Sequence, residues 1–394
     1  MSDTGCGIYP AELNFQPETR SATMSELTIS ASRSRVARLR AELAERDLDA
    51  LIVSQPSNRR YLSGFTGSAG YLLVSDRETR IATDFRYFEQ AAAQAPDFRL
   101  QPVAGPAFET WLPSLLSGLA GKKVGFEAAH LPYATFEQMA AVVRALPEGE
   151  RPRLVATTDV VERLRAIKEP GEIDAIQAAV DLTDAAFAHF MSRVEPGWTE
   201  KQAAWEIERY MREHGGEAVA FETIVAAGAW SAMPHAYPRD EPLGKGRPIV
   251  IDMGVRLDGY CSDLTRTIAL GEPDGEFRRI YDIVLGAQLT AIELIAAGMT
   301  GEQAHLLAER FIAEAGYGES FGHGLGHGVG LEVHEKPRLG RGSEDVLADG
   351  IMTSVEPGIY ISGWGGVRIE DLAVMENSRL RVLSRAPKID QAKA

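Results

Sequence analysis

The spacing of apolar residues predicts alternating helices and strands in the first part of the chain. Apolar side chains recur at the period of an amphipathic helix in one segment, and another segment contains a continuous apolar run typical of a buried strand. The pattern predicts an α/β domain over residues 31–162. The expected elements are helices at Ser34–Arg46 and Arg86–Ala95 and strands at Asp49–Ser54, Tyr71–Ser75 and Arg80–Thr83.

In the second part of the chain, two helical stretches repeat one pattern. The first opens at Gly197-Trp198-Thr199 and the second at Gly298-Met299-Thr300, and Gln, Ala, Glu, Arg, an aromatic residue, Glu and Gly then recur in the same register. A further helix is predicted from Ile173 to Val194. Coincidence between two amphipathic helices is the alternative explanation. The repeat predicts a duplicated α+β domain over residues 163–394, with two halves related by a pseudo-twofold axis.

Two aspartates lie on neighbouring predicted strands. Asp252 is in the strand-forming run Pro248–Val255, and Asp263 follows the hairpin signal Asp258-Gly259. With this turn, Asp252 opposes Thr265, and Asp263 lies diagonally across on the same face, roughly 7–8 Å away at the backbone. Two solvent-facing aspartates are the simpler interpretation, but carboxylates placed in this way repel each other unless a cation lies between them.

A glycine-rich stretch, Phe321–Glu335, contains His323, His327 and His334. Its glycines let the backbone approach a ligand closely and leave space where side chains would stand. No Lys-Ser/Thr pair follows, which argues against a phosphate-binding P-loop. Four other histidines have no comparable neighbours, and we expect them to be ordinary surface or core residues: His130, His189, His214 and His305.

Two further short strands supply Glu356, in the segment SVEPGIY, and Glu370, in GVRIED. Arg368 precedes Glu370 by two positions, so strand alternation places both side chains on one face. There Arg368 could neutralise a carboxylate or hold a substrate carboxylate through two hydrogen bonds.

The five candidate ligands are four carboxylates and one imidazole: Asp252, Asp263, His327, Glu356 and Glu370. This ratio suits a pair of divalent cations that share oxygen ligands and perform hydrolysis. A structural zinc site would instead need clustered cysteines and histidines, and the chain has two cysteines far apart, Cys6 and Cys261. We expect two divalent ions, with manganese first and cobalt or zinc as alternatives.

Composition narrows the range of partners. The 394-residue chain has a net charge of −15, which disfavours nucleic acid and anionic membranes. No apolar run reaches the roughly 18 residues of a membrane span, and the N-terminus lacks the apolar core of a signal peptide, so we expect a cytoplasmic protein. Residues 1–30 are polar and aperiodic, and we expect a disordered tail or a start codon placed too early, with Met24 as a candidate start.

Together, these motifs resemble those of the pita-bread metallopeptidases, and within them the proline-specific branch of prolidase (Xaa-Pro dipeptidase) and aminopeptidase P. The resemblance extends over about residues 30–390. It depends on Ala232-Met233-Pro234-His235, the two aspartates, His327 with His334, and the two glutamates. Tyr61–Gly70 and Thr83–Ala91 look like the smaller creatinase-type N-terminal domain of that branch.

The resemblance implies a role for each matching residue. Asp252, Asp263, His327, Glu356 and Glu370 would bind the two metals, and His235, His334 and Glu356 would be catalytic, stabilising the oxyanion or moving protons. His323, Arg368 and Tyr237 would contact substrate. The substrates would be proline-containing peptides, cleaved at the bond before proline, and family members commonly form dimers or tetramers.

Several alternatives stay open. A dipeptidase is preferred to an aminopeptidase acting on longer peptides because the chain, counted from Met24, has about the length of compact prolidases. Creatinase shares the fold without metal but lacks the five-ligand set. A non-catalytic relative that binds other proteins is a further alternative, although such relatives have lost ligands that this chain retains.

Overall fold

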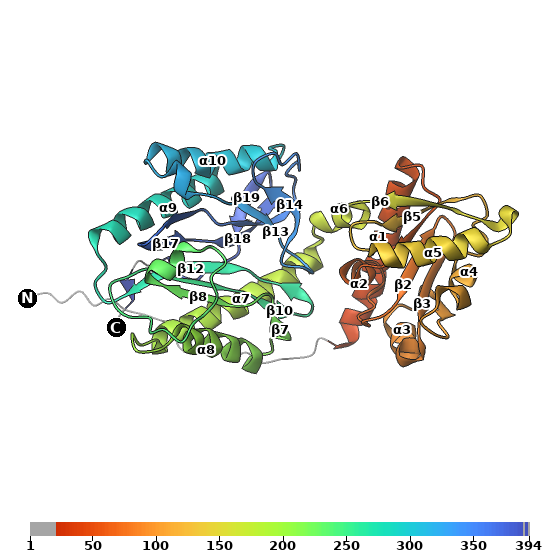
Figure 1. Ribbon diagram of the computed structural model, residues 1–394, viewed down its shortest axis with the longest axis horizontal. Coiled ribbons are helices and arrows are strands. Elements are labelled where there is room, and N and C mark those ends of the chain that lie inside the picture. Colours follow the sequence, from red (N-terminus) through yellow and green to blue (C-terminus); the bar gives the residue numbers. More distant parts are fainter. Residues whose placement is uncertain (1–20, 389–390, 393–394) are drawn as a thin grey trace, which may run out of the picture. The chain divides into compact units, whose positions relative to one another are not determined.

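The computed structural model describes residues 21–388 and 391–392 of the chain. These residues belong to two compact units, with the boundary between Val160 and Val161, close to the predicted boundary at residue 162 (Figure 1). Among the described residues, no helix is both long and apolar enough to cross a bilayer.

The first unit is built on a six-stranded sheet with the order β4-β3-β2-β1-β5-β6. The apolar run ALIV forms β1, which is buried along its whole length between an antiparallel and a parallel neighbour. The unit's elements are α1 (Ser21–Glu45), β1 (Ala50–Val53), α2 (Pro56–Ser63), β2 (Tyr71–Ser75), β3 (Thr79–Thr83), η1 (Phe85–Tyr87), α3 (Phe88–Gln94), β4 (Arg99–Pro102), η2 (Phe108–Thr110), α4 (Leu112–Leu115), β5 (Lys123–Glu127), α5 (Tyr133–Ala145), η3 (Glu148–Glu150), β6 (Arg153–Thr157) and α6 (Val160–Ala166), which crosses the boundary.

The segment 1–30, expected to be a disordered tail or an early start, includes the beginning of a helix, because α1 starts at Ser21. Residues 1–20 lie outside the described residues. The helix is anchored further on by Val36, Leu39 and Leu43, which are buried. Once a helix is nucleated, each added residue gains a hydrogen bond at little cost, so it extends through a segment without apolar periodicity.

A buried carboxylate, Glu127 at the end of β5, organises the interior of this unit. Its Oε2 accepts hydrogen bonds from the backbone N–H groups of Ser54 (2.6 Å) and Gln55 (2.7 Å) and from the Ser54 hydroxyl (3.0 Å). Its Oε1 accepts one from Asn58 Nδ2 at 2.7 Å. Because α2 begins directly after Gln55, the carboxylate holds the N-terminus of that helix to the sheet.

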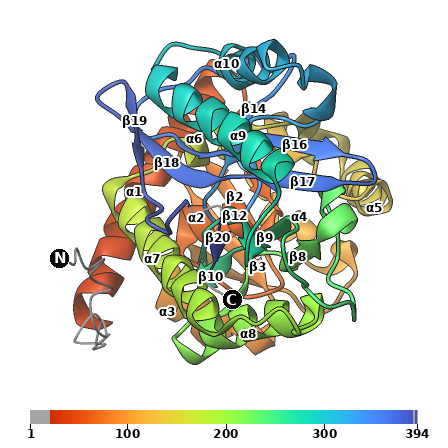
Figure 2. The same ribbon diagram turned by 90° about the vertical axis from the view of Figure 1, so that its left-hand side faces the viewer.

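The second unit contains two copies of a helix pair, α7/α8 and α9/α10, which lie on opposite sides of the strands (Figure 2). Its elements are α7 (Pro170–Arg193), α8 (Glu200–Glu213), β7 (Ala218–Val219), β8 (Ile224–Ala227), η4 (Gly228–Ala232), β9 (Ile249–Met253), β10 (Val255–Leu257), β11 (Tyr260–Cys261), β12 (Leu264–Leu270), α9 (Gly275–Leu294), α10 (Gly301–Glu314), η5 (Gly318–Ser320), β13 (Gly326–Gly328), β14 (Glu335–Leu339), β15 (Met352–Val355), β16 (Gly358–Ile361), β17 (Gly365–Arg368), β18 (Asp371–Glu376), β19 (Arg379–Val382) and β20 (Gln391–Ala392).

The predicted duplication is confirmed, down to the helix caps. Thr199 caps α8 and Thr300 caps α10, each in a capping box with the glutamine three residues later. Each cap residue also forms an isolated β-bridge, Thr199 with Pro242 and Thr300 with Val346. The unit is therefore a duplicated α+β fold.

Each half forms a sheet, with the orders β20-β12-β9-β8 and β14-β13-β15-β18-β19, and the C-terminal strand β20 joins the edge of the first. The predicted register of the first sheet is confirmed, because Asp252 on β9 pairs with Thr265 on β12. Asp258 and Gly259 both have positive φ, as a two-residue type I′ turn requires. The sheets are joined across the halves, since the backbone N–H of Glu370 donates to Thr265 O at 3.0 Å.

Candidate metal centre

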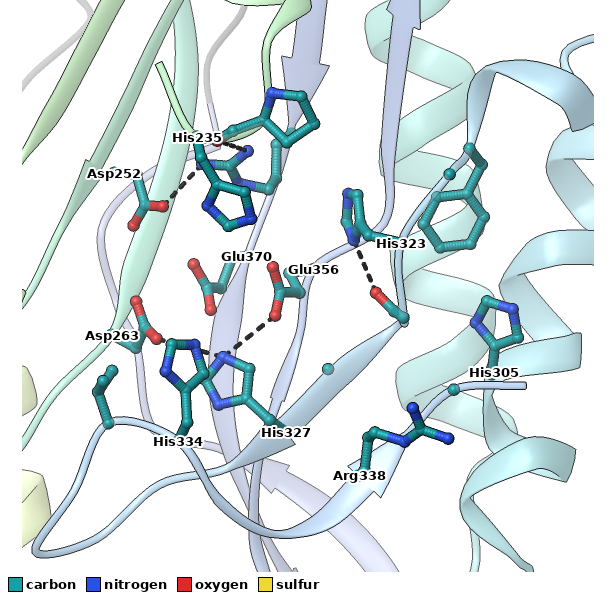
Figure 3. Close-up of a pocket in the computed structure, with 18 of the residues that line it drawn as sticks. His235, Asp252, Asp263, His305, His323, His327, His334, Arg338, Glu356 and Glu370 are labelled. Atoms are coloured by element: carbon teal, nitrogen blue, oxygen red, sulfur yellow. Dashed lines mark hydrogen bonds and ion pairs between the residues drawn. The ribbon is translucent and has the colours of Figure 1, made fainter. Parts of the chain in front are cut away.

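The five predicted metal ligands line one cavity of about 670 Å³ in the second unit. Asp252 is on β9, and Asp263 directly precedes β12. The second half supplies His327 on β13, Glu356 after β15, and Glu370 between β17 and β18. Figure 3 shows the four carboxylates directed toward a common space. Strands distant in the sequence thus converge on one site, as the spacing of the motifs predicted.

Short distances connect the imidazole to the acids. His327 Nε2 lies 3.3 Å from Glu356 Oε1 and 3.6 Å from Asp263 Oδ2. One potential ligand atom each from Asp263, His327 and Glu370 lies within 4.8 Å of the other two. A mixed set of oxygens and one nitrogen at this spacing is typical of sites for manganese, cobalt, zinc or iron.

Two carboxylate oxygens in the cavity lack hydrogen-bond partners among the described residues. They are Asp252 Oδ1 and Glu370 Oε1, and both are buried. An unsatisfied buried oxygen costs about 1–3 kcal/mol, so native proteins rarely leave one without a reason. A cation would satisfy both oxygens, and the residues therefore fit the divalent ions expected from the sequence.

The acids also repel each other strongly. Burial, with the charges of Glu370 and Asp252, raises the pKa of Asp263 well above its usual value. Burial and the charges of Glu356 and Asp252 raise the pKa of Glu370 in the same way. Burial would raise the pKa of Glu356 too, but the hydrogen bond and charge of His327 lower it overall. Positive charge supplied to the cavity would relieve this repulsion.

The ring orientation of His327 suits metal binding. Its Nδ1 lies 3.1 Å from the carbonyl oxygen of Gly328, which can only accept, so Nδ1 carries the proton. The Nε2 lone pair then points at the acids. This is the ring-fixing partner that a metal-binding histidine needs. Ser354 supports the arrangement, since its hydroxyl accepts from the His327 backbone N–H (3.0 Å) and donates to Glu356 Oε1 (3.1 Å).

Arg368, predicted to neutralise a carboxylate or bind substrate, is buried and bonded to protein groups. Its Nη2 donates to Asp252 Oδ2 at 2.7 Å, its Nε to Thr265 Oγ1 at 3.1 Å, and its Nη1 to the Tyr360 hydroxyl at 2.8 Å. The Thr265 hydroxyl in turn donates to Glu370 Oε2 at 2.7 Å. Of the two predicted roles, these contacts favour neutralisation of a carboxylate.

The histidines predicted to face substrate, His235, His323 and His334, line the same cavity. The ring centroid of His334 lies 4.3 Å from that of His327 (Figure 3). His323 Nδ1 lies 2.7 Å from Gly324 O, and its Nε2 lies 2.9 Å from the hydroxyl of Tyr360.

Tyr237 is the predicted site residue that the structure does not bring to the cavity. Its side chain is 59% exposed, and its ring meets Trp230 edge-on, with the ring centroids 5.2 Å apart. The resemblance implied a substrate contact for this residue, which follows His235 by two positions. The chain turns at that point, because the backbone N–H of Ala236 donates to Met233 O.

Sequence reasoning missed residues that support the ligands, namely Tyr360, Thr265 and Ser354. The signal for two of them was present: Tyr360 has the strand parity of Glu356, and Thr265 was predicted to oppose Asp252. His305, which we expected to be an ordinary residue, is buried and lines the cavity from α10. Its Nε2 lies 3.4 Å from Glu309 Oε2.

A cavity lined by paired acids, a histidine whose free ring nitrogen faces them and further histidines is typical of a metal-dependent hydrolase. Comparison with known proteins agrees: residues 174–377 match the model of metallopeptidase family M24, and residues 35–167 match the creatinase/prolidase N-terminal domain. The chain belongs to metallopeptidase family M24.

Similar proteins extend over nearly the whole chain. An Xaa-Pro dipeptidase of Pyrococcus horikoshii is 34% identical over 342 residues, which are 86% of this chain and 94% of that protein. The structure of an Xaa-Pro dipeptidase from Bacillus anthracis aligns with a TM-score of 0.86 at 39% identity, covering 91% of this chain and 99% of that one. An X-Pro aminopeptidase from Thermotoga maritima aligns with a TM-score of 0.81 at 35% identity, covering 91% and 99%.

Proposed function

We propose that this metallopeptidase is an Xaa-Pro dipeptidase that hydrolyses the bond before proline with two divalent ions. The observation that carries the proposal is the convergence of five ligand residues from both halves on one cavity. The similarity to the dipeptidases of Pyrococcus horikoshii and Bacillus anthracis supports this substrate class. An Xaa-Pro aminopeptidase is the second candidate, supported by the likeness to the Thermotoga maritima enzyme.

The proposed ligands are Asp252, Asp263, His327, Glu356 and Glu370, with Asp263 and Glu370 shared between the ions. Manganese is the metal we expect, and cobalt or zinc are the alternatives. When bound, the ions supply Lewis acidity and a water with a lowered pKa. Arg368 neutralises Oδ2 of Asp252, and this ion pair keeps the Asp252 carboxylate oriented toward the cavity.

The protein's own groups would then handle protons. Glu356 Oε1 lies 3.3 Å from His327 Nε2, and this carboxylate is proposed to accept a proton and return it. Burial lowers the pKa of His334, so its imidazole is neutral at pH 7 and can hydrogen-bond to substrate. His235 lines the cavity and is proposed to stabilise the oxyanion. The proton that Glu356 returns is proposed to reach the leaving nitrogen of proline through His334, whose neutral imidazole takes it up at one ring nitrogen and donates at the other.

The preference for proline would come from the shape of the cavity rather than from a hydrogen bond. Proline in the chain has no amide N–H, so a site that requires this donor rejects it. Apolar side chains in the cavity wall provide surface for the pyrrolidine ring, with Phe221, Pro234, Phe321 and Val333 among the lining residues.

A peptide panel tests the proposal. We expect turnover of Ala-Pro by the manganese-loaded protein, with slower turnover of Ala-Pro-Ala and little of Ala-Ala. A strong preference for Ala-Pro-Ala would establish the aminopeptidase instead. Equal turnover of Ala-Ala and Ala-Pro would contradict proline specificity. Repeating the panel with cobalt and zinc identifies the preferred metal.

A homodimer or homotetramer and a cytoplasmic location remain predictions. Sedimentation velocity of the purified protein checks the first, and cell fractionation checks the second. A purely monomeric protein at micromolar concentration would contradict the oligomer.

A further inference from the structure

The loop that carries His334 is held by buried charges outside the metal centre. This loop joins β13 to β14, and among the described residues none hydrogen-bonds to the His334 ring, whose recorded contact is the ring of His327. The position of the His334 ring therefore depends on its backbone.

The side chain of the adjacent residue, Glu335, holds the loop backbone in place. Its side chain is 4% exposed, and its Oε1 pairs with Nη2 of Arg165. Its Oε2 lies 3.2 Å from Nζ of Lys168. The backbone N–H of Glu332, inside the loop, donates to Glu335 Oε1 at 3.0 Å. Burial alone would raise the pKa of Glu335, but Lys168 and Arg165 lower it overall, so the carboxylate is charged.

The two cations are themselves fixed within the second unit. Their side chains are 3% (Arg165) and 1% (Lys168) exposed. Between them, Ile167 forms a β-bridge with Ile351, and the Lys168 backbone N–H donates to Gly350 O at 2.8 Å. Ile351 leads directly into β15, the strand that ends before Glu356. The cations thus form a rigid anchor attached to the strand that carries a proposed metal ligand.

The loop also reserves space for this carboxylate. A Cβ atom at Gly330 would lie 2.7 Å from Glu335 Oε2, closer than real contacts allow. The backbone of Gly330 does not have a positive φ that would require glycine. We therefore attribute the need for glycine here to the close approach of the Glu335 carboxylate.

We propose that Glu335 is a positioning residue for His334: its ion pairs with Arg165 and Lys168 clamp the loop and thereby set the His334 ring beside His327. The inference rests on the proposed function, in which His334 acts on substrate. Glu335 itself neither touches substrate nor binds metal in this account, although it lies in the cavity wall.

A double-mutant cycle tests the proposal on the full-length, manganese-loaded protein. Glu335→Gln keeps the size of the side chain and removes its charge. We expect kcat for Ala-Pro to fall about ten- to hundred-fold, with two metals still bound, because a small misplacement of a catalytic group costs rates of this order. In the His334→Ala background, the same substitution should change kcat less than about two-fold, since the group being positioned is absent.

A purely structural role predicts a different result. If Glu335→Gln lowers kcat by the same factor in both backgrounds, or lowers the bound metal, the proposal is overturned. If His334→Ala alone leaves kcat unchanged, the proposed role of His334 fails and this inference falls with it. If His334→Ala lowers kcat strongly and the losses from Glu335→Gln and His334→Ala simply multiply, the positioning role of Glu335 is overturned, but the role of His334 is not. Glu314→Gln, on the exposed face of α10, is the matched control and should change nothing.

Because loss of a buried charge can prevent folding, a second variant that keeps every charge is measured alongside the double-mutant cycle. Gly330→Ala leaves all charges in place and displaces the Glu335 carboxylate through its Cβ. We expect the same non-additive loss of kcat with His334→Ala. Wild-type activity of Gly330→Ala would contradict the proposal, as would an equal loss in both backgrounds.

Discussion

Two buried carboxylates, Glu127 in the first unit and Glu370 in the second, differ in the number of hydrogen-bond donors around them. Glu127 accepts hydrogen bonds from Ser54, Gln55 and Asn58, and both of its oxygens are satisfied. Glu370 accepts from the Thr265 hydroxyl at one oxygen, and its Oε1 is left without a partner among the described residues. Burial costs both groups hydration.

The difference separates a structural carboxylate from a proposed metal ligand. Where the protein provides its own donors, the charge stabilises the fold, as Glu127 does by holding α2. Where it gathers further acids instead, the metal-free fold is destabilised and the free energy is recovered when a cation binds. An unsatisfied buried acid beside other acids is therefore a stronger sign of a metal site than acidity alone.

The largest effect is expected from Asp263→Ala. Its carboxylate is the proposed shared ligand, so we expect loss of both metals and loss of activity by at least about 10³-fold, because the charge stabilisation they provide is worth several kcal/mol. Elemental analysis and Ala-Pro turnover measure the two effects. Full activity of this variant would refute the site assignment, and Asp174→Ala, on an exposed part of α7, is the control.

Glu127→Gln tests the structural side of the comparison. A glutamine side chain has one acceptor oxygen, so buried donors around Glu127 are left unpaired, and each costs about 1–3 kcal/mol. We expect the free energy of unfolding of the first unit to fall by about 3 kcal/mol in urea melts. Metal content at 25 °C should stay at the wild-type level. Unchanged stability would mean that the hydrogen bonds to this carboxylate contribute little.

His334→Ala separates chemistry from metal binding. We expect kcat to fall about 100-fold, within the range for a lost acid–base group, while two metals per chain remain bound. His130→Ala, an exposed histidine in the first unit, should have no effect. Loss of metal in His334→Ala would show that His334 belongs to the ligand set.

Glu370→Gln, measured on metal-free protein, should have the smallest effect and the opposite sign to Glu127→Gln. The folded-state pKa of Glu370 is raised well above its ordinary value, so its contribution favours folding at low pH and is lost as pH rises through that raised pKa. Removing the charge should therefore stabilise the metal-free protein, by about 1 kcal/mol at pH 8 and by less near pH 4. Thermal melts over this pH range check it. If Glu370→Gln destabilised the metal-free protein at pH 8, repulsion between Glu370 and the other acids of the cavity would not be what destabilises the wild-type protein.

The sequence allowed the five residues that converge on the cavity and the hairpin register to be predicted because both depend on local signals. Asp258-Gly259 specifies a two-residue turn, and that turn fixes the pairing of Asp252 with Thr265. The repeat of Thr199 and Thr300 as helix caps similarly predicted the duplication.

Residues whose role depends on tertiary contacts could not be predicted in this way. Tyr360 connects His323 to Arg368, and Ser354 connects His327 to Glu356, through hydrogen bonds between segments that local patterns do not relate. Tyr237 is the converse case, since a resemblance between motifs did not reveal that its ring packs against Trp230 and lies outside the cavity lining.

The most direct test of the central claim is the ratio of metal to protein after loading with manganese and removal of excess ion. We expect two ions per chain for the wild-type protein, because acids from both halves are proposed to share them. A ratio near zero under every loading condition would contradict it.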